Sequence, residues 1–157
     1  MYPMFLYNWQ VRDEWFEKLS ALPAEELAAV RNGGTGSFLK TLFHIIDVEY
    51  SWIRGAEGFD DPEPRYEDYA SLAALRSLSD NCRVYLRPIL AAMDTERERK
   101  SVKVPWDQES YLYGEVLRHI AAHEIHHIGQ LSIWARESGL EPVSAAFLGR
   151  NLSAFIE

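Results

Sequence analysis

The chain has 157 residues, a formal charge of −8, 47% hydrophobic residues and 25% charged residues. This composition is typical of a soluble globular protein, and the length fits one domain that spans residues 1–157. The acidic balance argues against a nucleic-acid partner, which would require a clustered basic face. The densest basic stretch, residues 97–100, is short and contains an acid.

The cysteine content and the apolar runs predict a cytoplasmic protein. Cys82 is the only cysteine, so an intramolecular disulfide is impossible and a reducing compartment is expected. The sequence shows neither an apolar run of about 18 residues nor an N-terminal signal pattern, so no association with a membrane is expected. Cys82 is either a reactive thiol or, as is more common, an inert small residue on a helix.

Apolar and aromatic residues recur at helical spacing in four long segments, over residues 2–21, 37–54, 71–93 and 110–138. Gly55 and Gly139 stand where helix-terminating glycines belong. Pro88 is expected to kink or shorten the third segment, in which Val84 is among the apolar side chains expected to face inward.

Shorter elements complete the prediction. A short helix opens with Pro23, residues 101–106 alternate like an extended segment, and the tail over residues 142–157 has room for one or two helical turns. Since strand signals are otherwise almost absent, the fold class is all-α, a four-helix bundle with short extra helices. Bundles of this kind build metal sites from side chains on facing helices.

Four of the five histidines fall within residues 119–127 of the last long helix. On a helix, His119, His123 and His127 stack along one side, and imidazoles one turn apart can reach a single metal ion. A projection at about 100° per residue places His123 and His127 at the centre of the apolar stripe, with His119 and His126 on its flank. Buried histidines can be satisfied by hydrogen bonds alone, but two adjacent inward ones favour a shared metal ion.

Two histidines hold an ion weakly, so a third ligand is required. The remaining histidine, His44, lies at the border between the polar and apolar faces of the second long helix. Glu49 falls inside the apolar arc of that helix and competes for the same role. Sequence spacing does not choose between them.

Two blocks of residues resemble the DinB-like family. Residues 123–130 match its H-E-x-H-H-x-G-Q signature, and residues 36–52 match its G-S-x-x-x-x-L-x-H-x-x-x-x-E-x-x-W pattern. Trp106, Gly139 and Pro142 also stand where the family has them. The resemblance covers essentially the whole chain in the expected order.

This resemblance implies an up-down-down-up bundle that forms a homodimer, for which Trp9, Trp15 or Trp134 offers a candidate interface. It implies three metal ligands, His44, His123 and His127. Glu49 would then be a buried group behind the ligands. Glu124, which projects away from the site, would form a salt link and not ligate.

Three neutral imidazoles leave a zinc or nickel ion with open positions for water or substrate. Relatives in the wider superfamily use bacillithiol or mycothiol, so the resemblance implies a thiol S-transferase in detoxification or stress response, in which a metal-held thiolate attacks a small-molecule electrophile. One alternative is a metal-dependent hydrolase, with His119, Glu49 or Tyr113 as acid or base. Another is a stress-induced scaffold dimer without catalysis.

Overall fold

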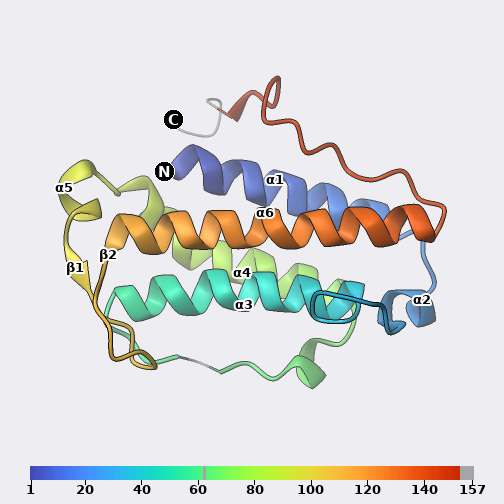
Figure 1. Ribbon diagram of the computed structural model, residues 1–157, viewed down its shortest axis with the longest axis horizontal. Helices are drawn as coiled ribbons and strands as arrows, with labels where there is room; N and C mark the ends of the chain where they lie inside the picture. Colours follow the sequence, from blue (N-terminus) through green and yellow to red (C-terminus); the bar gives the residue numbers. More distant parts are fainter. Residues whose placement is uncertain (62, 153–157) are drawn as a thin grey trace.

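The computed structural model describes residues 1–61 and 63–152 and confirms the all-α bundle (Figure 1). Four long helices form it: α1 (Tyr2–Leu19), α3 (Phe38–Ala56), α4 (Leu72–Ala91) and α6 (Tyr113–Glu137). In Figure 1, α1 and α6 run in one direction and α3 and α4 in the other, which is the up-down-down-up order. The parallel pair is possible because the connection over residues 57–71 crosses the length of the bundle.

The four helices form a square in cross-section, in which α3 packs against α4 and α6, and α1 packs against the same two helices. Helices α3 and α6 are therefore antiparallel neighbours along their length (Figure 1). The core between them is rich in aromatic residues from α1, including the fully buried Phe5, Trp15 and Phe16. This neighbour relation brings the second and the last long helices together at the candidate site.

Short elements occupy both ends of the bundle: α2 (Ala24–Ala28), η1 (Tyr66–Tyr69), α5 (Thr95–Glu98), β1 (Ser101–Val102) and β2 (Tyr111–Leu112). The strands β1 and β2 pair antiparallel, with Ser101 opposite Leu112 and Val102 opposite Tyr111. Of the extended segment expected over residues 101–106, the strand covers Ser101–Val102. The last helix was expected to begin at residue 110. It begins at Tyr113, because Tyr111 and Leu112 form the strand β2 that pairs with β1.

Side-chain caps set the start of two long helices. The Ser37 hydroxyl accepts a hydrogen bond from the Lys40 amide at the start of α3, and the Ser71 hydroxyl accepts one from the Ala74 amide at the start of α4. Gly55 does not end α3 as expected, because the helix continues to Ala56. A Cβ on Gly55 would lie 2.8 Å from the Trp106 ring, so this glycine permits a close approach of the later loop.

One expectation for α4, that Val84 faces inward, was wrong, and Pro88 does not end the helix. The helix continues through Pro88 to Ala91, and Val84 is 77% exposed instead of buried. The two facts are connected, since Pro88 cannot donate a hydrogen bond to the carbonyl of Val84 one turn earlier. At an exposed position water can satisfy that carbonyl, so the helix tolerates the proline.

The C-terminal tail packs along α1, and its residues 142–151 do not contain the turn or two of helix for which the tail has room. The Tyr7 hydroxyl donates to the Ala145 carbonyl at 2.8 Å, and Arg150 pairs with Glu14 at 2.7 Å. These contacts hold an irregular chain against the bundle. The rest of the predicted tail helix, residues 153–157, lies outside the described residues. Among the helices that the structure describes, none has the length and apolar character needed to cross a membrane.

Candidate metal centre

Three imidazoles meet between α3 and α6. The Nε2 atom of His123 lies 3.0 Å from Nε2 of His44 and 3.1 Å from Nε2 of His127. One ring nitrogen from each residue falls within 4.8 Å of the other two. His123 and His127 are one turn apart on α6, and His44 faces them from α3. The structure therefore brings together the pair that the helical projection selected and the histidine that sequence spacing could not choose over Glu49.

The cluster has the dimensions of a three-histidine metal site. Zinc–nitrogen bonds of about 2.0–2.1 Å at tetrahedral angles place ligand nitrogens about 3.4 Å apart, close to the two separations from Nε2 of His123 to Nε2 of His44 and of His127. Within residues 1–61 and 63–152, no carboxylate or thiol joins this group. The donor set therefore fits a divalent ion that keeps coordination positions open.

The surroundings of the cluster favour the neutral form of two of its imidazoles, those of His44 and His123. Burial, together with the neighbouring His127 and His44, lowers the pKa of His123 to about 4. Burial and the proximity of His127 also lower the pKa of His44. A metal ligand must present an unprotonated nitrogen. At neutral pH these two rings meet that condition without an energetic cost for losing a proton.

Gln130 determines how His127 is oriented. Its side-chain Oε1 lies 2.7 Å from Nδ1 of His127, so the ring donates its Nδ1–H there and turns Nε2 toward the cluster. The amide nitrogen of Gln130 lies 3.2 Å from Nε2 of His126. Gly34 abuts the same side chain, and a Cβ at this position, which has φ +55°, would collide with Gln130 Oε1. A role for Gln130 was not expected, although it is the last residue of the signature block.

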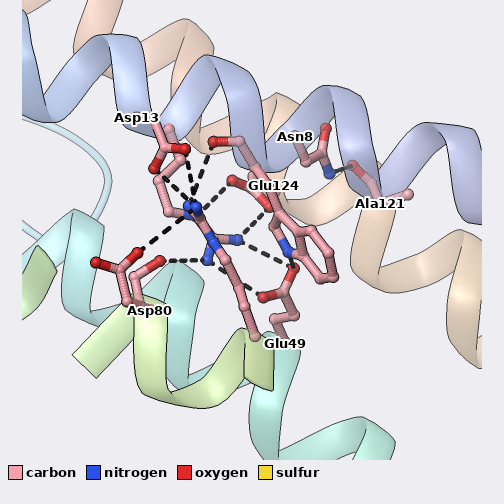
Figure 2. A network of polar contacts seen from close by, with 10 residues as sticks. Asn8, Asp13, Glu49, Asp80, Ala121 and Glu124 are labelled. Carbon is pink, nitrogen blue, oxygen red and sulfur yellow. Dashed lines mark hydrogen bonds and ion pairs between the residues drawn. The ribbon is translucent and has the colours of Figure 1, made fainter. Parts of the chain in front are cut away.

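The two candidate carboxylates point elsewhere. Both Glu49 and Glu124 are 1% exposed, and both bind the guanidinium of Arg12 from α1. Figure 2 shows the two carboxylates entering this network from opposite sides. The competing candidate Glu49 therefore lies outside the histidine group, and Glu124 forms the salt link that was expected of it.

Arg12 is the organising residue of this network, and the sequence patterns do not single it out. Its Nε donates to Glu124 at 2.8 Å, and its terminal nitrogens donate to Glu124, Glu49 and the Ser79 hydroxyl. Burial disfavours the charge of Arg12, but the two carboxylates raise its pKa overall. A usable signal is the polar pair Asn8 and Arg12, one turn apart on an otherwise aromatic helix face.

The remaining candidates are separate from the cluster or beside it. His119 and His126, which the projection placed on the flank of the apolar stripe, are exposed on α6. The Tyr113 hydroxyl donates to Glu57 at 2.6 Å, and burial raises its pKa. Cys82 is buried on α4, where burial and then the charge of Glu49 raise the pKa of its thiol to about 12. The inert alternative for this cysteine is therefore the one that the structure supports.

Comparison with known proteins agrees with this architecture. The family model described as DinB family matches residues 1–154. A relative from Bacillus subtilis (strain 168), described as uncharacterized protein YizA, is 50% identical over 153 residues, which cover 97% of this chain and 96% of that protein. A match of this extent, on a chain whose helices and histidines are arranged as described, places the protein in the DinB family.

Proposed function

We propose that the protein is a metal-dependent enzyme of the thiol S-transferase type. In this proposal His44, His123 and His127 hold a zinc or nickel ion, and a low-molecular-weight thiol reacts with an electrophilic small molecule. The observation that carries the proposal is the convergence of three Nε2 atoms without a carboxylate or thiol in the group, within the described residues. A structural zinc site would be closed by a fourth protein ligand.

The chemistry follows from the open positions. A divalent ion in such a site supplies a positive charge that stabilises a bound thiol as its thiolate. The sulfur of that thiol would form a bond to the electrophilic carbon, the leaving group would depart with its bonding electron pair, and the thiol proton would pass to solvent. The protein's own contribution is to hold three imidazoles in place, with His127 oriented by Gln130.

The nucleophile must come from outside the chain. Cys82 is the only cysteine, and a buried thiol whose pKa is raised to about 12 is a poor nucleophile at neutral pH. It also lies on α4, whereas the ligand histidines lie on α3 and α6. An external thiol is therefore part of the proposal, together with a role in detoxification or stress response and a cytoplasmic location.

A metal-dependent hydrolase is the second candidate, because an ion with open positions can also activate water. Hydrolysis would require a general acid or base beside the ion. Two of the three groups considered for that role are engaged elsewhere, Glu49 by Arg12 and Tyr113 by Glu57. His119 is the one that still lies beside the cluster, with its ring centre 6.1 Å from that of His123.

A homodimer also remains a proposal, but its interface cannot use the tryptophans first considered. Trp9, Trp15 and Trp134 are at most 3% exposed within one chain. Ile125 and Ile133 on α6 are instead 42% and 58% exposed. Light scattering of the purified protein measures the oligomeric state directly, and a mass of one chain would exclude the dimer.

The first experiment is elemental analysis of the purified, untagged protein beside a His123→Ala, His127→Ala double variant. We expect about one zinc or nickel ion per chain, absent from the double variant. The matched control is His126→Ala, which removes a histidine of the same helix and should retain the ion. A protein that binds no stoichiometric metal, even after zinc or nickel is added to chelated material, would contradict the proposal and favour the scaffold.

The second experiment tests the thiol. Cobalt-loaded protein should develop a thiolate-to-cobalt absorption band when low-molecular-weight thiols are added, and it should consume thiol in the presence of alkylating electrophiles. If esters or amides are hydrolysed without added thiol and no such band forms, the hydrolase replaces the transferase.

A further inference from the structure

A pocket of about 230 Å³ opens beside the histidine cluster, and neither the metal site nor the Arg12 network uses it. Its lining comes from α3, β2 and α6 and consists of Trp52, Tyr111, Glu115, Val116 and His119. The ring of His119 lies 5.3 Å from the Trp52 ring on one side and 6.1 Å from the His123 ring on the other. His119 therefore connects the pocket to the cluster.

The backbone geometry leads to the same conclusion. On α3, Trp52 lies eight residues after His44, and on α6, His119 lies four residues before His123. At about 100° per residue the spacing of four places His119 about 40° from His123, and the spacing of eight places Trp52 about 80° from His44, on the adjoining part of the helix surface. Because α3 and α6 are neighbours, the two rows define one site with a metal-binding part and an aromatic part.

The aromatic wall is held in place by its own contacts. Trp106 packs edge-on against Trp52, with ring centres 5.7 Å apart and planes at 88°, and it approaches α3 closely where Gly55 lacks a side chain. The Tyr111 hydroxyl donates to Asp107 at 2.8 Å. Two rings fixed in this way offer a preformed surface for a ligand, which limits the entropic cost of binding.

The lining selects the kind of group that fits. None of the five lining residues is a lysine or arginine, so an anionic group finds no partner there. The one carboxylate, Glu115, already accepts the Leu112 amide at 2.8 Å as a helix cap, and a nearby divalent ion would repel a cation. The volume is below the roughly 300–1,000 Å³ typical of pockets for drug-sized ligands, so a single ring fits better than a larger group.

We propose that this pocket is the substrate-recognition subsite of the metal centre and that it holds one uncharged aromatic ring of the substrate. The ring would pack on Trp52 and Tyr111, with the reacting group of the same molecule directed past His119 toward His44, His123 and His127. This proposal rests on the proposed function, since the metal centre supplies the other half of the site. It adds a substrate class, namely small electrophiles that carry an aromatic ring.

The test uses two metal-binding probes that require no turnover. Acetohydroxamate has only the metal-binding head, and phenylacetohydroxamate carries the same head with an aromatic ring. Calorimetry measures the dissociation constant of each probe on zinc-loaded protein. The ratio of the two constants gives the contribution of the aromatic ring to the affinity. Burying the ring should tighten binding by about tenfold or more. Probes that carry a carboxylate or a trimethylammonium group in place of the ring should gain nothing.

The variant Trp52→Leu should reduce this ratio to about threefold or less, because it removes one aromatic wall. The matched control is Trp106→Leu, which removes an indole of the same size that touches Trp52 but does not line the pocket, and which should keep most of the gain. Thermal unfolding verifies that both variants fold. If Trp52→Leu does not fold, Tyr111→Leu replaces it at the other wall, with the same expected loss.

The outcomes separate the two proposals. If neither probe binds and the protein takes up no zinc, the metal-centre proposal fails. If acetohydroxamate binds and the ring adds nothing, the pocket is not a recognition site although the metal centre stands. A gain that survives in Trp52→Leu, or that falls equally in both tryptophan variants, would also overturn the pocket assignment. A larger gain from a charged group would assign the pocket to that class of ligand instead.

Discussion

Arg12 and Glu124 form a two-point ion pair inside the bundle, with Nε to Oε1 at 2.8 Å and Nη2 to Oε2 at 2.6 Å. The same guanidinium also binds Glu49. Glu124 directly follows His123 on α6, and Glu49 lies on the helix of His44. The arginine of α1 therefore binds carboxylates from both helices that carry the histidine cluster.

Removing the shared cation should be costly. In Arg12→Met two buried carboxylates lose their partner, and breaking a buried ion pair in this way typically costs about 3–5 kcal/mol. Urea unfolding of the metal-free variant measures the loss. The control Arg65→Ala removes the exposed pair with Asp68 and should cost much less, because water screens that pair. A loss for Arg12→Met as small as that of the control would show that the network contributes little.

Gln130→Ala should weaken the metal centre without removing a ligand. The amide oxygen accepts the Nδ1–H of His127 and fixes its orientation, and loss of such a partner typically lowers metal affinity about 10–100-fold. Competition with a zinc chelator measures the affinity. His126→Ala, which removes the contact on the other side of Gln130, should leave the affinity near that of the wild type. Equal affinities for all three proteins would mean that His127 does not need this partner.

Acid should destabilise the metal-free protein. The pKa of His123 in the folded state is lowered to about 4, below its ordinary value of 6.5. As the pH falls from 6.5 toward 4, the unfolded chain takes up the proton first, so the free energy of unfolding decreases. Urea unfolding across this range should show the decrease, and His123→Ala should show a smaller one. Nuclear magnetic resonance of the metal-free protein should give an imidazole midpoint well below 6.5.

Cys82 should resist alkylation. With its pKa raised from 9 to about 12, the folded protein keeps the thiol protonated, so iodoacetamide should label it only after unfolding. Between pH 9 and pH 12 the unfolded chain loses this proton while the folded chain keeps it, so stability should fall as pH rises. Cys82→Ala should lack this contribution. Rapid labelling of the native wild-type protein would mean that the thiol is accessible after all.

The half of the site that lies on one helix could be predicted from periodicity alone. His123 and His127 lie one turn apart on a helix whose apolar stripe is evident, so their common side follows from helix geometry. The choice between His44 and Glu49 could not be made in this way. They are five residues apart, about 140° around a helix, and which of them meets α6 depends on how α3 is rotated against its two neighbours.

Other features also could not be predicted from the sequence, because they depend on contacts between segments that are far apart in the chain. The β-pair that delays the start of α6 joins Val102 to Tyr111 across a loop, and local patterns at residues 110–112 favour continuing the helix. The role of Arg12 depends on carboxylates 37 and 112 residues away. The exposure of Val84 depends on which face of α4 packs against α1 and α3, and local hydrophobicity does not report that choice.

The position of the histidines on two antiparallel neighbours has a consequence for the lifetime of the protein. An ion shared by His44 and His123 would connect positions 79 residues apart in the chain. In the chain-entropy model, a covalent link that closes a loop of this length stabilises the folded state by about 4 kcal/mol. A metal ion held there would act as a reversible cross-link between α3 and α6. A cell that runs short of the ion would then hold a protein that is both inactive and more readily unfolded and degraded.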